Sequence, residues 1–162
     1  MKKECDERAV RYSPNMVNMC MDFYDGDMQE GRLYHPYTAE AVSFSSLLGA
    51  LAYMERLYDR LQFPQAATRI RNFQKNRREK ERQRGKEIRK RTEFERREIR
   101  ELETFDHVTE QRGKDATFLI RVKYRQNSSW QGEVTWVDRH KKEYFRSALE
   151  LIRLIDSAMN EG

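Results

Sequence analysis

The residues in this sequence whose type and spacing indicate a binding function are basic. Thirteen lysines and arginines and eight glutamates lie between Lys75 and Glu103, a surplus that equals the net charge of +5 of the whole chain. Clustered guanidinium and ammonium groups neutralise phosphates and give salt-sensitive binding of nucleic acid. The glutamates allow a second interpretation, in which the charges pair with one another along a solvated connector. The cations of this segment that we expect to contact nucleic acid are Arg77, Arg78, Arg82, Arg84, Arg89, Lys90, Arg91, Arg96 and Arg97.

A second basic set alternates along a predicted strand. Because successive side chains of a strand point to opposite faces, Arg121, Lys123 and Arg125 are expected on one outward face of a sheet. Such a face can bind single-stranded nucleic acid when aromatic rings beside it stack on the bases. The nearby aromatic side chains share the parity of the core side and are expected to pack there; they are Tyr124, Trp130 and Trp136.

The residues that usually form catalytic or metal sites are scattered. The three histidines, His35, His107 and His140, lie far apart and none stands at ligand spacing from a cysteine. The sequence contains no phosphate loop, dinucleotide fingerprint or nucleophile elbow. We therefore expect no catalytic residues, no metal, no cofactor and no enzymatic activity.

The two cysteines, Cys5 and Cys20, are too few for a disulfide framework, and Cys20 has the outward parity of the first predicted strand. No apolar run is long enough to span a membrane, and Met1-Lys2-Lys3 does not lead into a hydrophobic signal region. The sequence predicts a reduced, cytoplasmic protein that does not bind a membrane. Its 162 residues suffice for one ordinary domain or two small ones.

The basic strand belongs to a unit that is clearly patterned to fold. Apolar residues alternate from Phe118 to Tyr124, a turn follows at 127–129, and a second strand is expected over 130–137. A short third strand is expected over 142–145. Ser147 then begins a predicted helix, with Glu150 at capping-box spacing.

That unit occurs twice. When residues 16–60 are laid over 117–161, a constant offset of 101, the strand parity, the turns and the helix starts agree without a gap. Gly31 falls on Gly132, and Ser46 falls on Ser147. We interpret this agreement as an internal duplication. A hairpin centred on each turn would place two oppositely charged pairs directly across the ladder, Lys123 with Glu133 and Asp22 with Arg32.

The predicted fold is α+β, with two pseudo-symmetric β-meander-plus-helix repeats joined by a long charged helix or linker. The expected organisation is a polar leader over 1–15, a first repeat over 16–64, a charged helical linker over 65–105 and a second repeat over 106–162. The linker is rich in helix-forming residues, and disorder is the alternative. The apolar surfaces of the two helices are expected to meet inside one chain, with a homodimer interface as the alternative.

The second repeat resembles a family of small uncharacterised proteins from anaerobic Gram-positive bacteria. The matching segments are FLIRVKYRQN over 118–127, SWQGEVTW over 129–136 and FRSALELIRLIDSA over 145–158. The resemblance implies no activity. The tandem layout is also similar to that of purine-rich-element binding (PUR) proteins, which hold single-stranded nucleic acid on the sheet, although the sequence contains none of their motifs.

We expect a non-enzymatic binding or regulatory protein. In one hypothesis, the charged linker and the face of Arg121, Lys123 and Arg125 bind nucleic acid or a nucleic-acid-associated complex. In the other, a sheet face or the charged helix docks on a protein partner, as in an adaptor or an inhibitor of a nucleic-acid enzyme encoded by a mobile element. We take the first hypothesis as the expected function and the second as its alternative.

Overall fold

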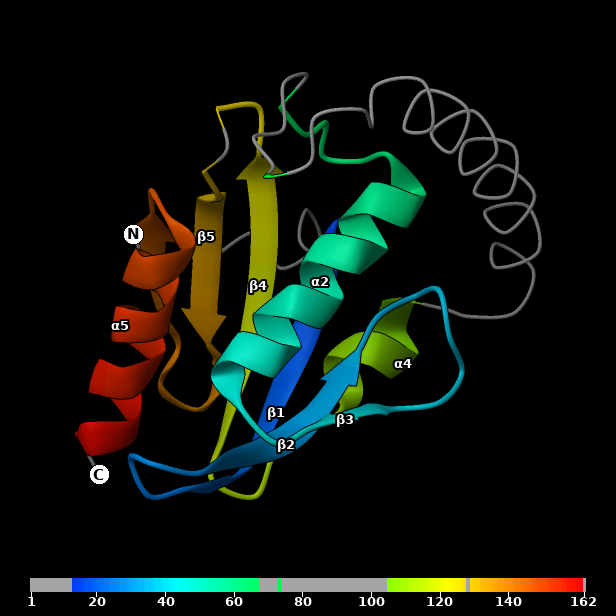
Figure 1. Ribbon diagram of the computed structural model, residues 1–162. Coiled ribbons are helices and arrows are strands. Elements are labelled where there is room, and N and C mark those ends of the chain that lie inside the picture. The colour runs from blue at the N-terminus through cyan, green and yellow to red at the C-terminus, as the bar shows by residue number, and fades with distance from the viewer. Residues whose placement is uncertain (1–12, 68–72, 74–104, 128, 162) are drawn as a thin grey trace, which may run out of the picture.

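A computed structural model describes residues 13–67, 73, 105–127 and 129–161. Within these residues, six strands form one antiparallel sheet in the order β3-β2-β1-β4-β5-β6 (Figure 1). The strands are β1 (Met16–Tyr24), β2 (Gln29–Tyr34), β3 (Val42–Phe44), β4 (Ala116–Tyr124), β5 (Gln131–Trp136) and β6 (Lys141–Phe145). The helices are α2 (Leu47–Leu61), α4 (Phe105–Glu110) and α5 (Ala148–Asn160), with a 3-10 turn η1 (Val137–Arg139). The α+β class is confirmed.

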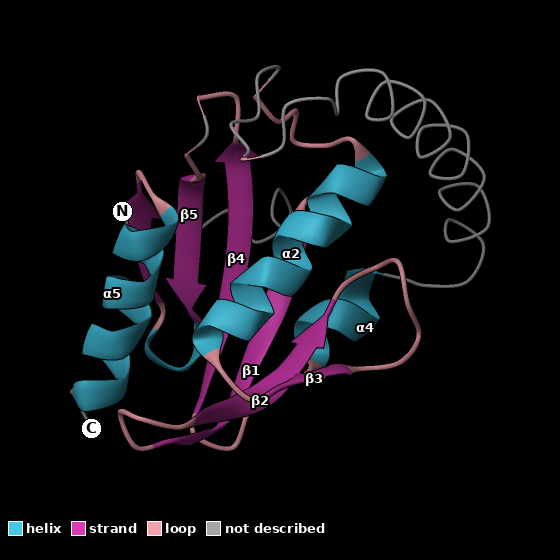
Figure 2. Ribbon diagram, in the orientation of Figure 1, coloured by secondary structure: helices cyan, strands magenta, loops and turns pink. Residues whose placement is uncertain are grey.

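Helices α2 and α5 cover one face of the sheet, and the shorter α4 lies behind it (Figure 2). Each long helix begins where a serine satisfies a free backbone N–H, since Ser46 accepts from Gly49 and Ser147 accepts from Glu150. The predicted helix start at Ser147 is confirmed. Both helices turn an apolar stripe towards the sheet and contribute to one continuous core.

The two hairpins share one register. In the first, Met19 pairs with Leu33 and Met21 with Gly31. Each pair recurs 101 residues later, because Ile120 pairs with Val134 and Val122 with Gly132. The register shifts once in each hairpin, at Asp22 and at Lys123, where a β-bulge interrupts the ladder.

This register corrects the predicted charge pairing. Lys123 does not lie opposite Glu133, because the bulge leaves Lys123 without a ladder partner and Arg121 takes that position. The predicted ion pairs still form across the hairpins, with 3.2 Å between Lys123 Nζ and Glu133 Oε2. In the first hairpin, 2.7 Å separates Arg32 Nε from Asp22 Oδ2. The bulged residue therefore reaches its partner diagonally and not across the ladder.

A glycine fixes the register of each hairpin. Gly31 lies opposite Phe44 and Gly132 opposite Phe145 in the ladders to the edge strands. A Cβ at Gly31 would lie 2.2 Å from the carbonyl oxygen of Cys20, and a Cβ at Gly132 would lie 2.0 Å from that of Arg121. Neither position leaves room for a side chain, so a shifted register would bring a larger residue into backbone contact.

Strands β1 and β4 join the two hairpins through six antiparallel pairs. Asn18 lies opposite Leu119, and these two residues are themselves 101 positions apart. On the face opposite the long helices, the Asn18 side chain donates to the carbonyl oxygens of Val108 (2.7 Å) and Gln111 (3.0 Å), which hold α4 and the loop after it over β1. Cys20 is consequently buried, and burial raises the pKa of its thiol to about 11.

Among the described residues, no helix has the length and apolar character needed to cross a membrane.

The buried His35 links stability to pH. Tyr37 N–H donates to Nδ1 (3.1 Å) and Nε2 lies 2.8 Å from the Tyr53 hydroxyl, which it reaches as donor in the neutral ring. Burial, and secondarily the charge of Arg60, lower the pKa of His35 from 6.5 to about 4. Between these two pH values His35 is protonated in the unfolded state and neutral in the folded state. The free energy of unfolding should therefore fall as the pH falls from 6.5 towards 4, by about 1.4 kcal/mol per pH unit from this residue.

Urea denaturation at several pH values between 7 and 4.5 measures this slope, with His35→Gln as the comparison because glutamine does not titrate. We expect the variant to be less stable at pH 7 and to lose less stability on acidification. Parallel curves for the two proteins would contradict the assignment.

The glycine contacts predict equal effects in the two hairpins. Gly31→Ala and Gly132→Ala should each lower the free energy of unfolding by about 3 kcal/mol, because backbone atoms must move to admit the Cβ. Gly49→Ala in α2 is the control, with a smaller effect expected: its Cβ would lie 3.0 Å from one side-chain atom, the capping Ser46 Oγ, and a gain in helix propensity of up to about 1 kcal/mol offsets that contact. Urea denaturation checks all three, and a neutral result at Gly31 or Gly132 would contradict the register.

Candidate functional site

Most of the residues predicted to bind nucleic acid lie outside the described part of the chain. Three of them, Arg121, Lys123 and Arg125, lie within it at the end of β4. The other nine lie between 74 and 104, outside the described residues: Arg77, Arg78, Arg82, Arg84, Arg89, Lys90, Arg91, Arg96 and Arg97.

Arg121 and Lys123 share a cluster on the sheet face opposite α2 and α5. Glu133 of β5 stands at its centre, 3.8 Å from Arg121 Nε and 3.2 Å from Lys123 Nζ. Lys142 of β6 completes the cluster, with Nζ 3.6 Å from Glu133 Oε1. Three cations therefore surround one carboxylate, and the cluster keeps a positive charge. We call Arg121, Lys123, Glu133 and Lys142 the basic cluster.

Glu133 is 6% exposed, yet it stays ionised. Burial raises its pKa, but the hydrogen bond from Lys123 and the charges of Lys142, Lys123 and Arg121 outweigh burial and hold the pKa below its usual value. The carboxylate thus fixes the positions of the three cations while neutralising only one of them. Fixed cations lose less side-chain entropy when they bind a phosphate.

Two exposed aromatic rings border the basic cluster. Tyr144 of β6 is 66% exposed, and Lys123 Nζ lies 5.6 Å from the centre of its ring. Tyr124 is 61% exposed, so the prediction that it packs in the core is wrong. The bulge at Lys123 is the reason, because it changes which face of the sheet the following residues point to. Trp130 is buried as predicted, and Trp136 stacks on Phe118.

The same bulge moves Arg125 away from the basic cluster, which corrects the expectation that Arg121, Lys123 and Arg125 share an outward face. Arg125 is buried beneath the end of α2 and donates to the carbonyl oxygen of Pro64 from Nε (2.9 Å) and from Nη2 (2.6 Å). Its Nη1 lies 2.9 Å from Asp59 and 3.2 Å from Glu55. Arg125 therefore holds the loop after α2 against the end of β4.

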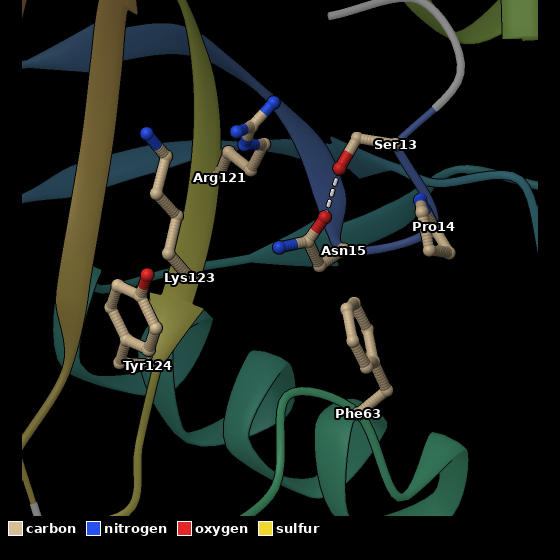
Figure 3. Close-up of a pocket in the computed structure, with 7 residues that line it drawn as sticks. All are labelled: Ser13, Pro14, Asn15, Phe63, Arg121, Lys123 and Tyr124. Atoms are coloured by element: carbon tan, nitrogen blue, oxygen red, sulfur yellow. Dashed lines mark hydrogen bonds between the residues drawn. The ribbon is translucent and has the colours of Figure 1, made fainter.

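A pocket of about 360 Å³ opens beside the basic cluster (Figure 3). Arg121, Lys123 and Tyr124 extend from β4 on one side of it. Phe63, from the loop that Arg125 holds, lies on the other side with the segment before β1. That segment contributes Ser13, Pro14 and Asn15.

Sequence reasoning missed Lys142, Tyr144 and Phe63 in this region, and also the segment from Ser13 to Asn15. The alternation within the predicted strand 142–145 places Lys142 and Tyr144 on one face, and this signal was sufficient to find them. No local signal indicates Phe63 or Asn15, because each reaches the site through a contact distant in sequence. Asn15 donates to the carbonyl oxygen of Val122 across 107 positions.

The described residues contain no group of three or more histidine, cysteine, aspartate or glutamate side chains that could hold a metal ion.

Comparisons of the chain with protein-family models, with curated proteins and with solved structures found no match.

The position of Arg125 predicts a structural role. Arg125→Gln should lower the free energy of unfolding by about 3 kcal/mol, because charge-assisted hydrogen bonds to Pro64 and Asp59 are lost in a buried setting. Arg121→Gln is the matched control, with its guanidinium 3.8 Å from Glu133 and half-exposed, and should cost about 0.5 kcal/mol. Urea denaturation measures both, and equal losses would contradict the distinction.

Proposed function

We propose that this protein binds single-stranded nucleic acid, without catalysis, on the sheet face formed by β4, β5 and β6. The observation that supports this function is the basic cluster with two exposed rings beside it. Arg121, Lys123 and Lys142 supply fixed positive charge for phosphates, while Tyr124 and Tyr144 offer ring faces for bases. Cations that follow a backbone and rings that accept bases are the usual means of holding a single strand.

A duplex fits this surface less well than a single strand. In a duplex the bases are stacked on one another, so their faces cannot reach Tyr124 or Tyr144. Because every base has a π-face, stacking of this kind tolerates any sequence. We therefore propose binding with little sequence preference that weakens as salt rises.

The charged linker is proposed to add phosphate contacts to the same strand. Its nine candidate cations, Arg77, Arg78, Arg82, Arg84, Arg89, Lys90, Arg91, Arg96 and Arg97, would raise affinity without reading bases. The chain that leads into this segment is held at the end of β4, where Ala66 forms a bridge with Arg125.

We further propose that the two halves are repeats of one duplicated module, of which only the second binds. The common register, the paired glycines and the helix caps support the duplication. The positions that correspond to the binding residues have diverged: Cys20 stands for Arg121, Asp22 for Lys123, Ala41 for Lys142 and Ser43 for Tyr144. The counterparts of Arg121, Lys123 and Lys142 therefore carry no positive charge, and of the two rings only Tyr124 has an aromatic counterpart, Phe23.

A protein partner is the second candidate function, and exposed leucines favour it. Leu48 and Leu149 stand at the same position in the first turns of α2 and α5, and both are exposed. They lie on the helical side of the sheet, away from the basic cluster. An adaptor or inhibitor would use that side, and its binding would be insensitive to loss of the cluster's charges.

The proposed function predicts how salt affects binding. In a fluorescence anisotropy titration, a labelled dT12 strand should bind more tightly than a duplex of the same length, with an affinity that falls steeply between two salt concentrations. Arg121→Gln/Lys142→Gln removes two cations and leaves the shortest ion pair of Glu133, at 3.2 Å to Lys123, in place. Its plot of log affinity against log salt should be less steep by about 1.4.

The matched control is Arg56→Gln/Arg153→Gln, which removes two exposed charges from α2 and α5 on the other side of the sheet. This variant should keep the slope of the wild type. Arg89→Gln/Lys90→Gln/Arg91→Gln tests the linker separately in the same titration. Absence of strand binding even at low salt would overturn the proposal and favour the protein partner.

A further inference from the structure

The pocket beside the basic cluster lies where the chain before β1 approaches β4. The corresponding place in the first half, where the chain before β4 approaches β1, is closed. There Asp115 N–H donates to the carbonyl oxygen of Met21 (2.9 Å) and Lys114 N–H donates to Asp22 Oδ1 (3.1 Å). Arg32 adds a hydrogen bond to the carbonyl oxygen of Arg112 (3.0 Å). The backbone of 112–115 therefore lies directly against the bulge of β1.

Close packing of that segment requires a glycine. A Cβ on Gly113 would lie 2.5 Å from the carbonyl oxygen of Met21 and 2.2 Å from that of Ala116. In the first half, the backbone of 112–115 therefore packs directly against the backbone of β1, with no side chain between them.

Proline prevents the same closure in the second half. Pro14 corresponds to Asp115 at the offset of 101, and proline has no N–H to donate to Val122, the counterpart of Met21. The side chain of Asn15 makes this hydrogen bond instead, with Nδ2 2.6 Å from the carbonyl oxygen of Val122. The Asn15 side chain reaches farther towards β4 than a backbone N–H would, and the pocket of about 360 Å³ lies beside it.

The lining of the pocket matches one nucleotide. Phe63 and Tyr124 present exposed rings, and Arg121 and Lys123 present cations beside them. The Asn15 amide is held in place, because Nδ2 donates to Val122 and Oδ1 accepts from the Ser13 hydroxyl. The pocket therefore has rings for a base and charges for a phosphate.

We propose that this pocket takes one unstacked base of a bound single strand, with the adjoining phosphate at Arg121 and Lys123. The inference rests on the proposed function and places the base at the end of β4. Arg125 acts as a positioning residue, since its hydrogen bonds to Pro64 hold Phe63 at the pocket wall.

The test is anisotropy titration of labelled dT12 with full-length variants. Tyr124→Ala and Phe63→Ala should each weaken binding by about tenfold, because stacking on one ring is lost. The dependence on salt should stay as in the wild type, since no charge is removed. Tyr124→Phe should keep the affinity, because stacking needs the ring and not the hydroxyl. Phe23→Ala is the matched control, since Phe23 is the exposed counterpart of Tyr124 on the closed half, and it should bind as the wild type does.

The outcomes separate the pocket from the proposed function. If dT12 binds with the expected salt dependence but Tyr124→Ala and Phe63→Ala behave like Phe23→Ala, the pocket inference is overturned and strand binding stands. If dT12 does not bind at low salt, both are overturned. Free dTMP is the second probe and should compete with dT12 only weakly, because it lacks the neighbouring phosphates. Competition by dTMP at the affinity of the strand would overturn the strand as the ligand.

Discussion

The antiparallel pairing of β1 with β4 is the interaction on which the rest of the structure depends. It connects two hairpins that lie about one hundred residues apart in sequence, through the pairs from Met16–Arg121 to Met21–Ala116. Each half alone has one thin layer of helix on a three-stranded sheet, which is little core for its surface. The ladder merges the two apolar faces, so that α2 and α5 share one core cluster.

Contacts between the halves reinforce this ladder in the same way on both sides. At the end of β1, the Tyr24 hydroxyl donates to Asp156 of α5. At the end of β4, Arg125 reaches Glu55 of α2. Tyr24 corresponds to Arg125 and Asp156 corresponds to Glu55 at the offset of 101. Each central strand is therefore bound to the helix of the other half, which explains why a buried arginine stands at a position that looks like surface in sequence.

The elements of the fold could be predicted from the sequence because their signals are local. Alternation marked β1 and β4, turn residues marked the hairpins, and Ser147 marked the start of α5. The ladder register could not be predicted in the same way. It depends on the bulge at Lys123 and on the close packing of the Phe145 ring against Gly132. The alternation of apolar residues indicates neither of these features.

The candidate site was half-predicted for the same reason. Arg121 precedes the bulge and Lys123 forms it, and both lie on the predicted face of the sheet. Tyr124 and Arg125 follow the bulge, so Tyr124 is exposed where burial is expected and Arg125 is buried where exposure is expected. Asn15 and Phe63 enter the site through long-range contacts that no spacing in the chain reveals.

The position of Asn18 opposite Leu119 has a consequence for shortened chains. A fragment holding only the second half would expose the N–H and C=O groups of β4 as a bare edge, with apolar side chains beside them. The β4 strand of a second copy of the fragment would pair with this edge in the antiparallel β1–β4 register. Leu119 of one copy would then lie opposite Leu119 of the other. Such a fragment would be expected to self-associate, and full-length chains avoid this because the matching strand is covalently attached.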